Sequence, residues 1–454
     1  MAQEVKVPKR ILNTLLASLE AGVVPRAGAP YIAIGRNEEI ASLLDNLDTV
    51  AAGGATVRFL IGRFGSGKSF LIQLIRGYAL ERDFLSADAD LSPERKLSGA
   101  GGIATYRELM RNLACKAMPD GGALPTVLSR FYIRLKEEIV SGGILPETPA
   151  FEATLKQKVY ATLSEMEGGV GGFEFAGVLG AYYTALAQGD EEKKSACLRW
   201  LRGEFSTKTE ARAALGFRVG GIIDDANWYE YLKLWALLSV KLGYRGLLVY
   251  IDECINLYKI PNRISREANY EKLLSIFNDT LQGRAQHLGV FFGGTPQFLE
   301  DTRRGLFSYD ALRSRLSDSR FTAMGYESLS APVMRLRRLS DNELLALITR
   351  LAKLYAQKTG GEEVLTPEQM QAFLSHELSR VGSSEMVTPR EIIRDFLSLC
   401  AILHAHPEAD FHTLVRQVSV SVADGDEVHP APIEETVFPK NKAGQKITLS
   451  DITF

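Results

Sequence analysis

The residues whose types and spacing most clearly predict chemistry are the eight from Gly62 to Ser69, with the sequence GRFGSGKS. They match the phosphate-loop pattern G-x-x-x-x-G-K-[ST] at every fixed position, between a strand-like run and a helix predicted over Phe70–Leu80. We expect Lys68 to contact the β- and γ-phosphates of ATP and the Ser69 hydroxyl to bind Mg²⁺. The residues predicted to contact the nucleotide in this segment and at the start of the following helix are Gly62, Gly65, Ser66, Gly67, Lys68, Ser69 and Phe70.

A second segment with predicted chemistry is the apolar run Leu247–Glu253, which ends in two adjacent acids. A buried strand rarely ends in paired carboxylates unless a cation or a catalytic task is near, because burying unpaired charge is costly. We expect Asp252 to bind magnesium and Glu253 to orient or deprotonate the attacking water, so the predicted reaction is ATP hydrolysis. The pair alone is also typical of an ordinary turn, and its combination with the phosphate loop carries the prediction.

A parallel sheet is the element that would bring these segments together. Several apolar runs lack a polar face, as in parallel strands covered by helices on both sides, and helical patterns separate them. The predicted strands are Val57–Gly62, Asp83–Ala89, Leu247–Glu253, Gly289–Thr295 and Pro332–Leu339. Residues 118–217, between the second and third strands, predict a helical insertion with a joint at Gly168–Gly172.

The chain after Leu339 predicts short helices only. Ser340 with Glu343, and Thr388 with Glu391, have the spacing of capping boxes, and Thr366–Pro367 opens another helix. The predicted division is residues 1–56 for N-terminal helices and an adenine-side element, 57–338 for the nucleotide-binding domain, 339–418 for a small all-helical lid domain, and 419–454 for an extended tail.

Composition excludes some classes of protein. The 454 residues carry 53 basic and 55 acidic side chains, so nothing favours non-specific nucleic-acid binding. The four cysteines lack the spacing of a zinc site and read as reduced thiols. The sequence has no signal-peptide pattern and no apolar run of membrane-spanning length, so we expect a cytoplasmic protein without membrane contact.

Three further segments resemble AAA+ ATPases. Thr295 ends the predicted strand after the acidic one, where that family carries the polar sensor 1 residue; the same threonine could simply cap the next helix. Arg390 follows the Thr388 cap, where AAA+ lids carry the sensor 2 arginine; a basic residue in a first helical turn opposes the helix dipole, and a phosphate contact would explain it. Arg36, in Gly35–Glu39, resembles the element that packs near adenine in the origin-recognition and STAND branches, although these residues also fit a plain strand, turn and helix start.

The segment Tyr309–Leu316 resembles the one that carries the arginine finger in AAA+ proteins. Arg315 is the preferred finger and Arg313 the alternative. An arginine here would stabilise charge on the nucleotide of a neighbouring subunit, so the resemblance implies a homo-oligomer. An ordinary surface helix with two arginines is the competing interpretation.

The order of motifs over Leu12–Val415 resembles the ATP-binding proteins of bacterial BREX-type phage-defence loci, the BrxD-like family. Besides the segments above, Gly22–Pro25, Asn227-Trp228, Gly243–Leu247 and Phe277–Asp279 carry the resemblance. It implies an AAA+ ATPase in anti-phage defence that works beside a superfamily 2 helicase. Two other interpretations stay open: a STAND-like switch that binds ATP tightly and turns over slowly, and a scaffold with a structural nucleotide, which Glu253 disfavours.

Contact with DNA is a further hypothesis. It depends on a local excess of arginines, two of which, Arg335 and Arg337, would share a face of the last predicted strand. Solvated or inter-subunit arginines explain the excess equally well. The set is Arg303, Arg304, Arg313, Arg315, Arg335, Arg337 and Arg338.

Overall fold

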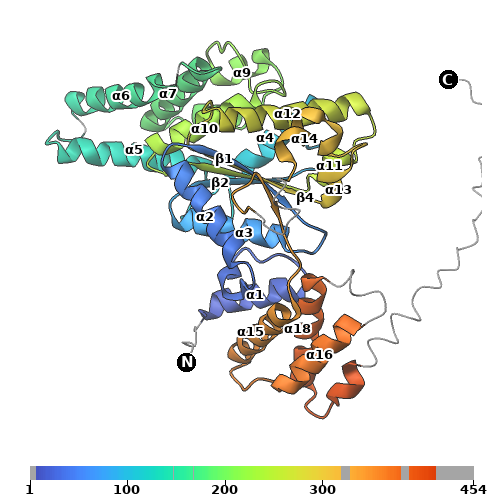
Figure 1. The fold of residues 1–454 in the computed structure, drawn as a ribbon. Coiled ribbons are helices and arrows are strands. Elements are labelled where there is room, and N and C mark those ends of the chain that lie inside the picture. The colour runs from blue at the N-terminus through green and yellow to red at the C-terminus, as the bar shows by residue number, and fades with distance from the viewer. Residues whose placement is uncertain (1–6, 147, 167, 319–327, 380–387, 416–454) are drawn as a thin grey trace, which may run out of the picture.

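The computed structural model describes residues 7–146, 148–166, 168–318, 328–379 and 388–415. Within these residues a five-stranded parallel sheet has the order β2-β3-β4-β1-β5, which confirms the predicted α/β fold with a five-stranded parallel sheet (Figure 1). The strands are β1 (Ala55–Ile61), β2 (Leu85–Asp90), β3 (Leu247–Asp252), β4 (Leu288–Gly294) and β5 (Val333–Arg335). The tail predicted over residues 419–454 lies outside the described residues.

Both faces of the sheet are buried, as the apolar runs predict. In β3, Leu247, Val249 and Ile251 belong to one core, while Leu248 and Tyr250 point into the other. Successive side chains of a strand face opposite sides, so a strand covered on both sides needs apolar residues throughout.

Helices cover the two faces. One face packs against α2 (Asn37–Ala51) and α3 (Lys68–Glu81), and the other against α4 (Gly102–Arg111), α10 (Trp228–Lys241) and α12 (Arg263–Leu281). Short helices follow β3 and β4: α11 (Ile255–Tyr258), α13 (Pro296–Glu300), η3 (Leu306–Ser308) and α14 (Asp310–Leu316).

The long segment between β2 and β3 is helical. Its middle part extends away from the sheet on the side opposite the C-terminal helices (Figure 1). It begins with η2 (Gly99–Gly101) and α4, ends with α10, and contains α5 (Leu124–Ser141), α6 (Pro149–Ser164), α7 (Gly172–Gln188), α8 (Glu191–Leu201) and α9 (Lys208–Leu215). None of the helices in the described part of the chain combines the length and apolar character that a membrane crossing requires.

The N-terminal helix packs with the C-terminal helices. Leu12, Leu15 and Leu16 of α1 (Lys9–Glu20) share one buried core with α15 (Asp341–Thr359), α16 (Pro367–Ser379) and α18 (Pro389–Ala405). Helix α1 and the C-terminal helices α15, α16 and α18 therefore form one helical body beside the sheet (Figure 1), which we call the terminal helical body. The short η1 (Ala29–Ile32) connects α1 to α2.

The last strand is shorter than predicted. It ends at Arg335, because the following residues leave the sheet and Arg337 binds Gly35 and Glu343 instead. The prediction that Arg335 and Arg337 share one face of a strand is therefore wrong. Arg335 contacts Glu300 and Asp318, so both arginines have acidic partners within the chain.

Candidate active site

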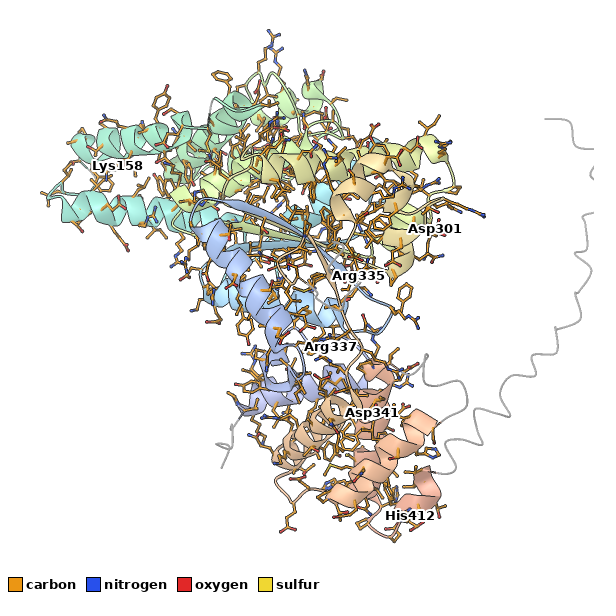
Figure 2. All side chains as sticks on the ribbon, in the orientation of Figure 1. Lys158, Asp301, Arg335, Arg337, Asp341 and His412 are labelled. Carbon is orange, nitrogen blue, oxygen red and sulfur yellow. The ribbon has the colours of Figure 1, made fainter. Side chains whose placement is uncertain are left out.

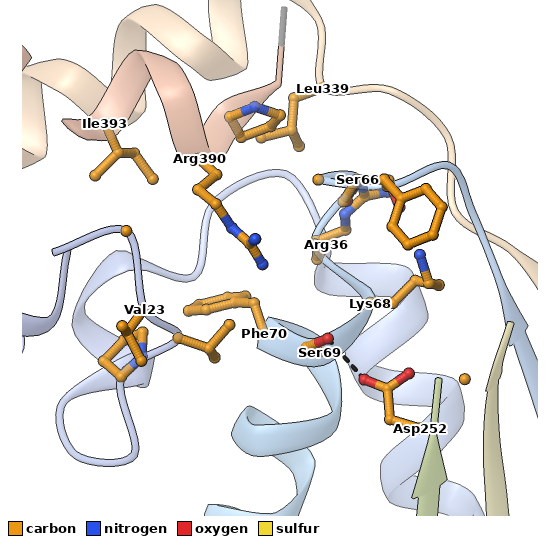
Figure 3. Close-up of a pocket in the computed structure, with 18 of the residues that line it drawn as sticks. Val23, Arg36, Ser66, Lys68, Ser69, Phe70, Asp252, Leu339, Arg390 and Ile393 are labelled. Atoms are coloured by element: carbon orange, nitrogen blue, oxygen red, sulfur yellow. Dashed lines mark hydrogen bonds between the residues drawn. The ribbon is translucent and has the colours of Figure 1, made fainter. Parts of the chain in front are cut away.

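A cleft lined by charged and polar groups lies between the carboxyl ends of the strands and the terminal helical body (Figure 3). It encloses about 1220 Å³ when its open mouth is counted. Residues from the phosphate loop, the ends of β3 and β4, α1 and its following loop, α15 and α18 all line it. Ligands of open α/β sheets bind at this edge of the sheet.

The segment Gly62–Ser69 connects β1 to α3 as the phosphate-loop pattern predicts. Gly65 and Gly67 have φ values of +73° and +93°, which residues with a side chain rarely adopt. The space where a Cβ of Gly67 would lie is open, and the Ser66 hydroxyl is buried without a hydrogen-bond partner among the described residues. An open cradle beside an unpartnered hydroxyl, at the N-terminus of a helix, suits phosphate oxygens.

Lys68 is the buried cation of the loop. Its ammonium donates to the carbonyl oxygens of Gly62, at 2.8 Å, and Arg63, at 2.9 Å. Burial lowers the pKa of Lys68, and the carboxylates of Asp252 and Glu253 oppose that shift. The ammonium is therefore held inside the loop that would surround a β- or γ-phosphate.

The two predicted magnesium ligands lie in direct contact. The Ser69 hydroxyl donates to Asp252 Oδ2 at 2.6 Å, the bond drawn as a dashed line in Figure 3. The other carboxylate oxygen accepts the backbone N–H of Glu253 at 2.8 Å. Gly293 of β4 makes this approach available, because a Cβ there would lie only 2.1 Å from Asp252 Oδ1. A hydroxyl and a carboxylate at one point are oxygen ligands that Mg²⁺ accepts.

Glu253 is the first residue after β3, and its backbone is strained. Its φ is +56°, an uncommon value for a residue with a side chain. Such outliers often occur at functional sites, where the surrounding structure holds them. The strain turns the chain out of the sheet and leaves Glu253 lining the cleft. Acidic groups gather at these strand ends: burial and then the charges of Asp252, Asp88 and Glu253 raise the pKa of Asp90.

Thr295 follows β4, lines the cleft and is buried. Its hydroxyl also accepts the Phe298 N–H at 3.3 Å and so caps α13. The geometry therefore suits both a helix cap and a polar residue that contacts the nucleotide or the water, since a hydroxyl that accepts one N–H can still donate its own proton.

Arg390 reaches the cleft from α18. Figure 3 shows its guanidinium directed toward Phe70 and Ser69. The predicted capping box of Thr388 and Glu391 is present and fixes this first turn. Thr388 packs against the phosphate loop so closely that a Cβ on Gly65 would lie 2.4 Å from its methyl carbon.

Arg36 lines the cleft, but its guanidinium is occupied by the protein. It is buried, pairs with Glu39 at 2.8 Å, and donates to the carbonyl oxygens of Ser66 and Arg337. The structure therefore places Arg36 behind the phosphate loop, where it connects that loop to the segment after β5.

The two candidate finger arginines do not line this cleft. Arg315 is exposed on α14 and donates to Ala311 O of its own helix, while Arg313 pairs with Asp310. Neither arginine lies with the other predicted site residues, most of which line the cleft.

The residues of the apolar part of the cleft are not among the predicted site residues. This wall comes from chain segments far apart in sequence and can hold the flat, apolar faces of a base. It includes Leu19, Val23, Val24, Pro25, Ile32, Ile34, Leu339, Leu347 and Ile393. Only the fold brings these residues together, although Gly22–Pro25 already appears among the segments that carry the family resemblance.

The parallel sheet with a phosphate loop after β1 and an acidic pair after β3 is consistent with a P-loop NTPase. The family model described as "BREX system ATP-binding protein BrxC/D" matches residues 7–419. The chain therefore belongs to this family of BREX ATP-binding proteins, as its motifs suggested. A search of curated proteins finds no match.

Proposed function

We propose that this chain is an AAA+ module that binds and hydrolyses ATP within a BREX-type defence system. The observation that carries the proposal is the contact between Ser69 of the phosphate loop and Asp252 after β3, with Glu253 next to it. The AAA+ assignment is supported by β4, which lies between β1 and β3 and so puts Thr295 near both segments. It is also supported by a small helical body that extends Arg390 over the site, as a lid would.

In this proposal, each group acts where charge changes during hydrolysis. Lys68 neutralises the β- and γ-phosphates, and Arg390 adds a second cation from the opposite wall. Glu253 accepts a proton from the attacking water, and the Thr295 hydroxyl orients that water or the γ-phosphate. Such positioned charges supply most of the catalysis in phosphoryl transfer.

Ser69 and Asp252 would hold Mg²⁺, and their donor atoms fit it. No group of three or more His, Cys, Asp or Glu side chains in the described ranges could enclose a metal. Magnesium commonly takes only one or two protein ligands besides phosphates and waters, so a hydroxyl and one carboxylate suffice. When bound, the ion would neutralise charge on the β- and γ-phosphates.

The proposal includes a homo-oligomer in which Arg315 acts on the nucleotide of a neighbouring subunit. Its support is that Arg315 is exposed and lies away from a cleft that already contains Lys68 and Arg390. A superfamily 2 helicase and DNA are proposed as further partners on the family resemblance alone. Intramolecular partners hold Arg304, Arg313, Arg335 and Arg337, which weakens the argument for a basic DNA surface.

Steady-state phosphate release tests hydrolysis. The parent should turn over Mg–ATP, and Glu253→Gln should bind ATP normally while turnover falls about 10²-fold or more, the scale of general-base catalysis. Undiminished turnover in Glu253→Gln would remove the assigned base. A parent that purifies with retained nucleotide and barely turns over, with DNA and helicase present, would favour the STAND-like switch instead.

A further inference from the structure

Two arginines bind each other's segments where the sheet connects to the terminal helical body. Arg36 donates to Arg337 O at 2.6 Å, and Arg337 donates to Gly35 O at 3.2 Å. Arg337 also forms a two-point ion pair with Glu343, with distances of 2.8 Å and 2.6 Å. We call Gly35, Arg36, Arg337 and Glu343 the clasp. Figure 2 shows Arg337 where the chain passes from the sheet toward the terminal helical body.

The clasp is fitted closely. A Cβ on Gly35 would lie 2.6 Å from the carboxylate carbon of Glu343, so only glycine permits this approach. Glu343 has a second task, because it completes the capping box with Ser340 that begins α15. The same carboxylate therefore fixes the start of a helix and binds Arg337, whose guanidinium donates to Gly35 O.

The clasp connects both walls of the cleft. On one side, Arg36 donates to the Ser66 carbonyl oxygen in the phosphate loop at 3.2 Å. On the other side, Glu343 lies in the first turn of α15, which contributes Leu347 to the cleft and packs against α18, the helix that carries Arg390. A displacement of the terminal helical body would have to break or stretch the contacts of Arg337.

We propose that Arg337 and Glu343 are positioning residues that hold the terminal helical body over the phosphate loop and thereby slow the release of bound nucleotide. The effect on nucleotide release rests on the proposed function. The positioning of the terminal helical body does not, because it depends only on contacts within the protein. Arg36 connects the phosphate loop to Arg337 through its hydrogen bonds to Ser66 O and Arg337 O. Arg337 connects this segment to α15 through its ion pair with Glu343.

Two conservative variants weaken the clasp without removing a side chain. Glu343→Gln keeps an acceptor for the Ser340 cap, since glutamine also serves in capping boxes, but it loses the charge. Arg337→Lys keeps the charge but loses the planar two-point geometry. Lys358→Ala is the matched control, because it breaks the Lys358–Glu20 pair, also partly exposed, within the terminal helical body itself.

The first measurement is release of a fluorescent ATP analogue chased by unlabelled ATP. Glu343→Gln and Arg337→Lys should each release it about two- to five-fold faster, the range of a partly exposed ion pair. The double variant should add little to either single one, since both changes act on one contact. Lys358→Ala should release at the parent rate. Release at the parent rate in both clasp variants would overturn the inference.

The second measurement needs no nucleotide. Spin labels at the exposed positions Asp45 on α2 and Gln371 on α16 report the distance between the sheet and the terminal helical body. The four cysteines are all buried, which favours selective labelling. The distance distribution should be narrow in the parent and broader in Glu343→Gln, and equal widths would contradict the clasp. If the parent binds no nucleotide while the distribution still broadens, the proposed function fails and the positioning role stands.

Discussion

Gly293→Ala offers a sharp test of the magnesium and water geometry, because the three atoms nearest to the added methyl group belong to the Asp252 carboxylate and to Ile72. The new Cβ would lie 2.1 Å from Asp252 Oδ1 and 3.2 Å from the Cδ1 atom of Ile72. Non-bonded carbon and oxygen atoms need more than about 3 Å, so the Asp252 carboxylate has to move by about 1 Å. That movement breaks its alignment with the Ser69 hydroxyl and the Glu253 N–H.

A misplacement of this size costs about 10²-fold in rate when it affects groups aligned for reaction, and we expect that loss in Mg–ATP turnover. Overpacking should also cost about 1–3 kcal/mol of stability. The assay is phosphate release over a magnesium titration at a temperature where thermal melting shows the variant folded. ATP binding without magnesium should be retained, since Lys68 and the loop are untouched.

Two matched variants separate the carboxylate from general strain. Gly289→Ala overpacks the same strand at its other end, where the new Cβ would lie 2.7 Å from Leu248 Cδ2 and far from the acids. Gly77→Ala adds a methyl group to α3 in open space. Gly289→Ala should lose stability yet retain turnover once folded, and Gly77→Ala should lose neither. Turnover of Gly293→Ala within two-fold of the parent, or an equal loss in Gly289→Ala, would show that the Asp252 position does not control turnover.

Three further predictions concern other parts of the site. Mixing Arg315→Ala with Lys68→Ala should restore part of the ATPase activity, because some interfaces then pair an intact site with an intact finger worth about 10³- to 10⁵-fold; no recovery in mixed oligomers would count against a finger in trans. Arg390→Ala should weaken nucleotide binding roughly ten-fold or more in a titration, as loss of a charged hydrogen bond does, whereas the control Arg394→Ala on the same helix should bind like the parent. The hydrogen bonds and charge of Arg337, with the Ser340 N–H, hold the pKa of Glu343 at about 2, below its usual 4.5. The stabilisation from such a carboxylate is complete above its usual pKa and is lost as the pH falls from there through the lowered value. The ratio of release rates between Glu343→Gln and the parent should therefore be constant from about pH 5.5 to 8.5, and a ratio that falls to one within that range would contradict the ion pair.

The strands and the phosphate loop were predictable because their signals are local. Apolar runs without a polar face identify β1, β3 and β4, and the glycine spacing with Lys68 and Ser69 identifies the loop. The errors at strand ends are also local in origin. Asp83 has a φ of +59°, so β2 begins at Leu85, and Glu253 turns out of β3 for the same reason.

Contacts between distant segments were not predictable. Periodicity shows that α1 has an apolar face, but nothing in the sequence says that this face packs on α15 and α18, more than 300 residues later. The same holds for two close approaches that only a missing side chain allows. Asp252 lies against Gly293, and Thr388 lies against Gly65. Arg313, Arg335 and Arg337 likewise read as part of a basic surface until the fold shows their acidic partners.

The central claim is that this chain binds ATP through the phosphate loop, with Lys68 on the phosphates. The most direct test is an equilibrium titration of Mg–ATP against the parent and Lys68→Ala, both shown by circular dichroism to be folded. We expect saturable binding by the parent and a loss of at least about ten-fold in affinity in Lys68→Ala, since charged hydrogen bonds contribute about 1.5–3 kcal/mol. Equal affinity in the two proteins, or no binding by the parent, would contradict it.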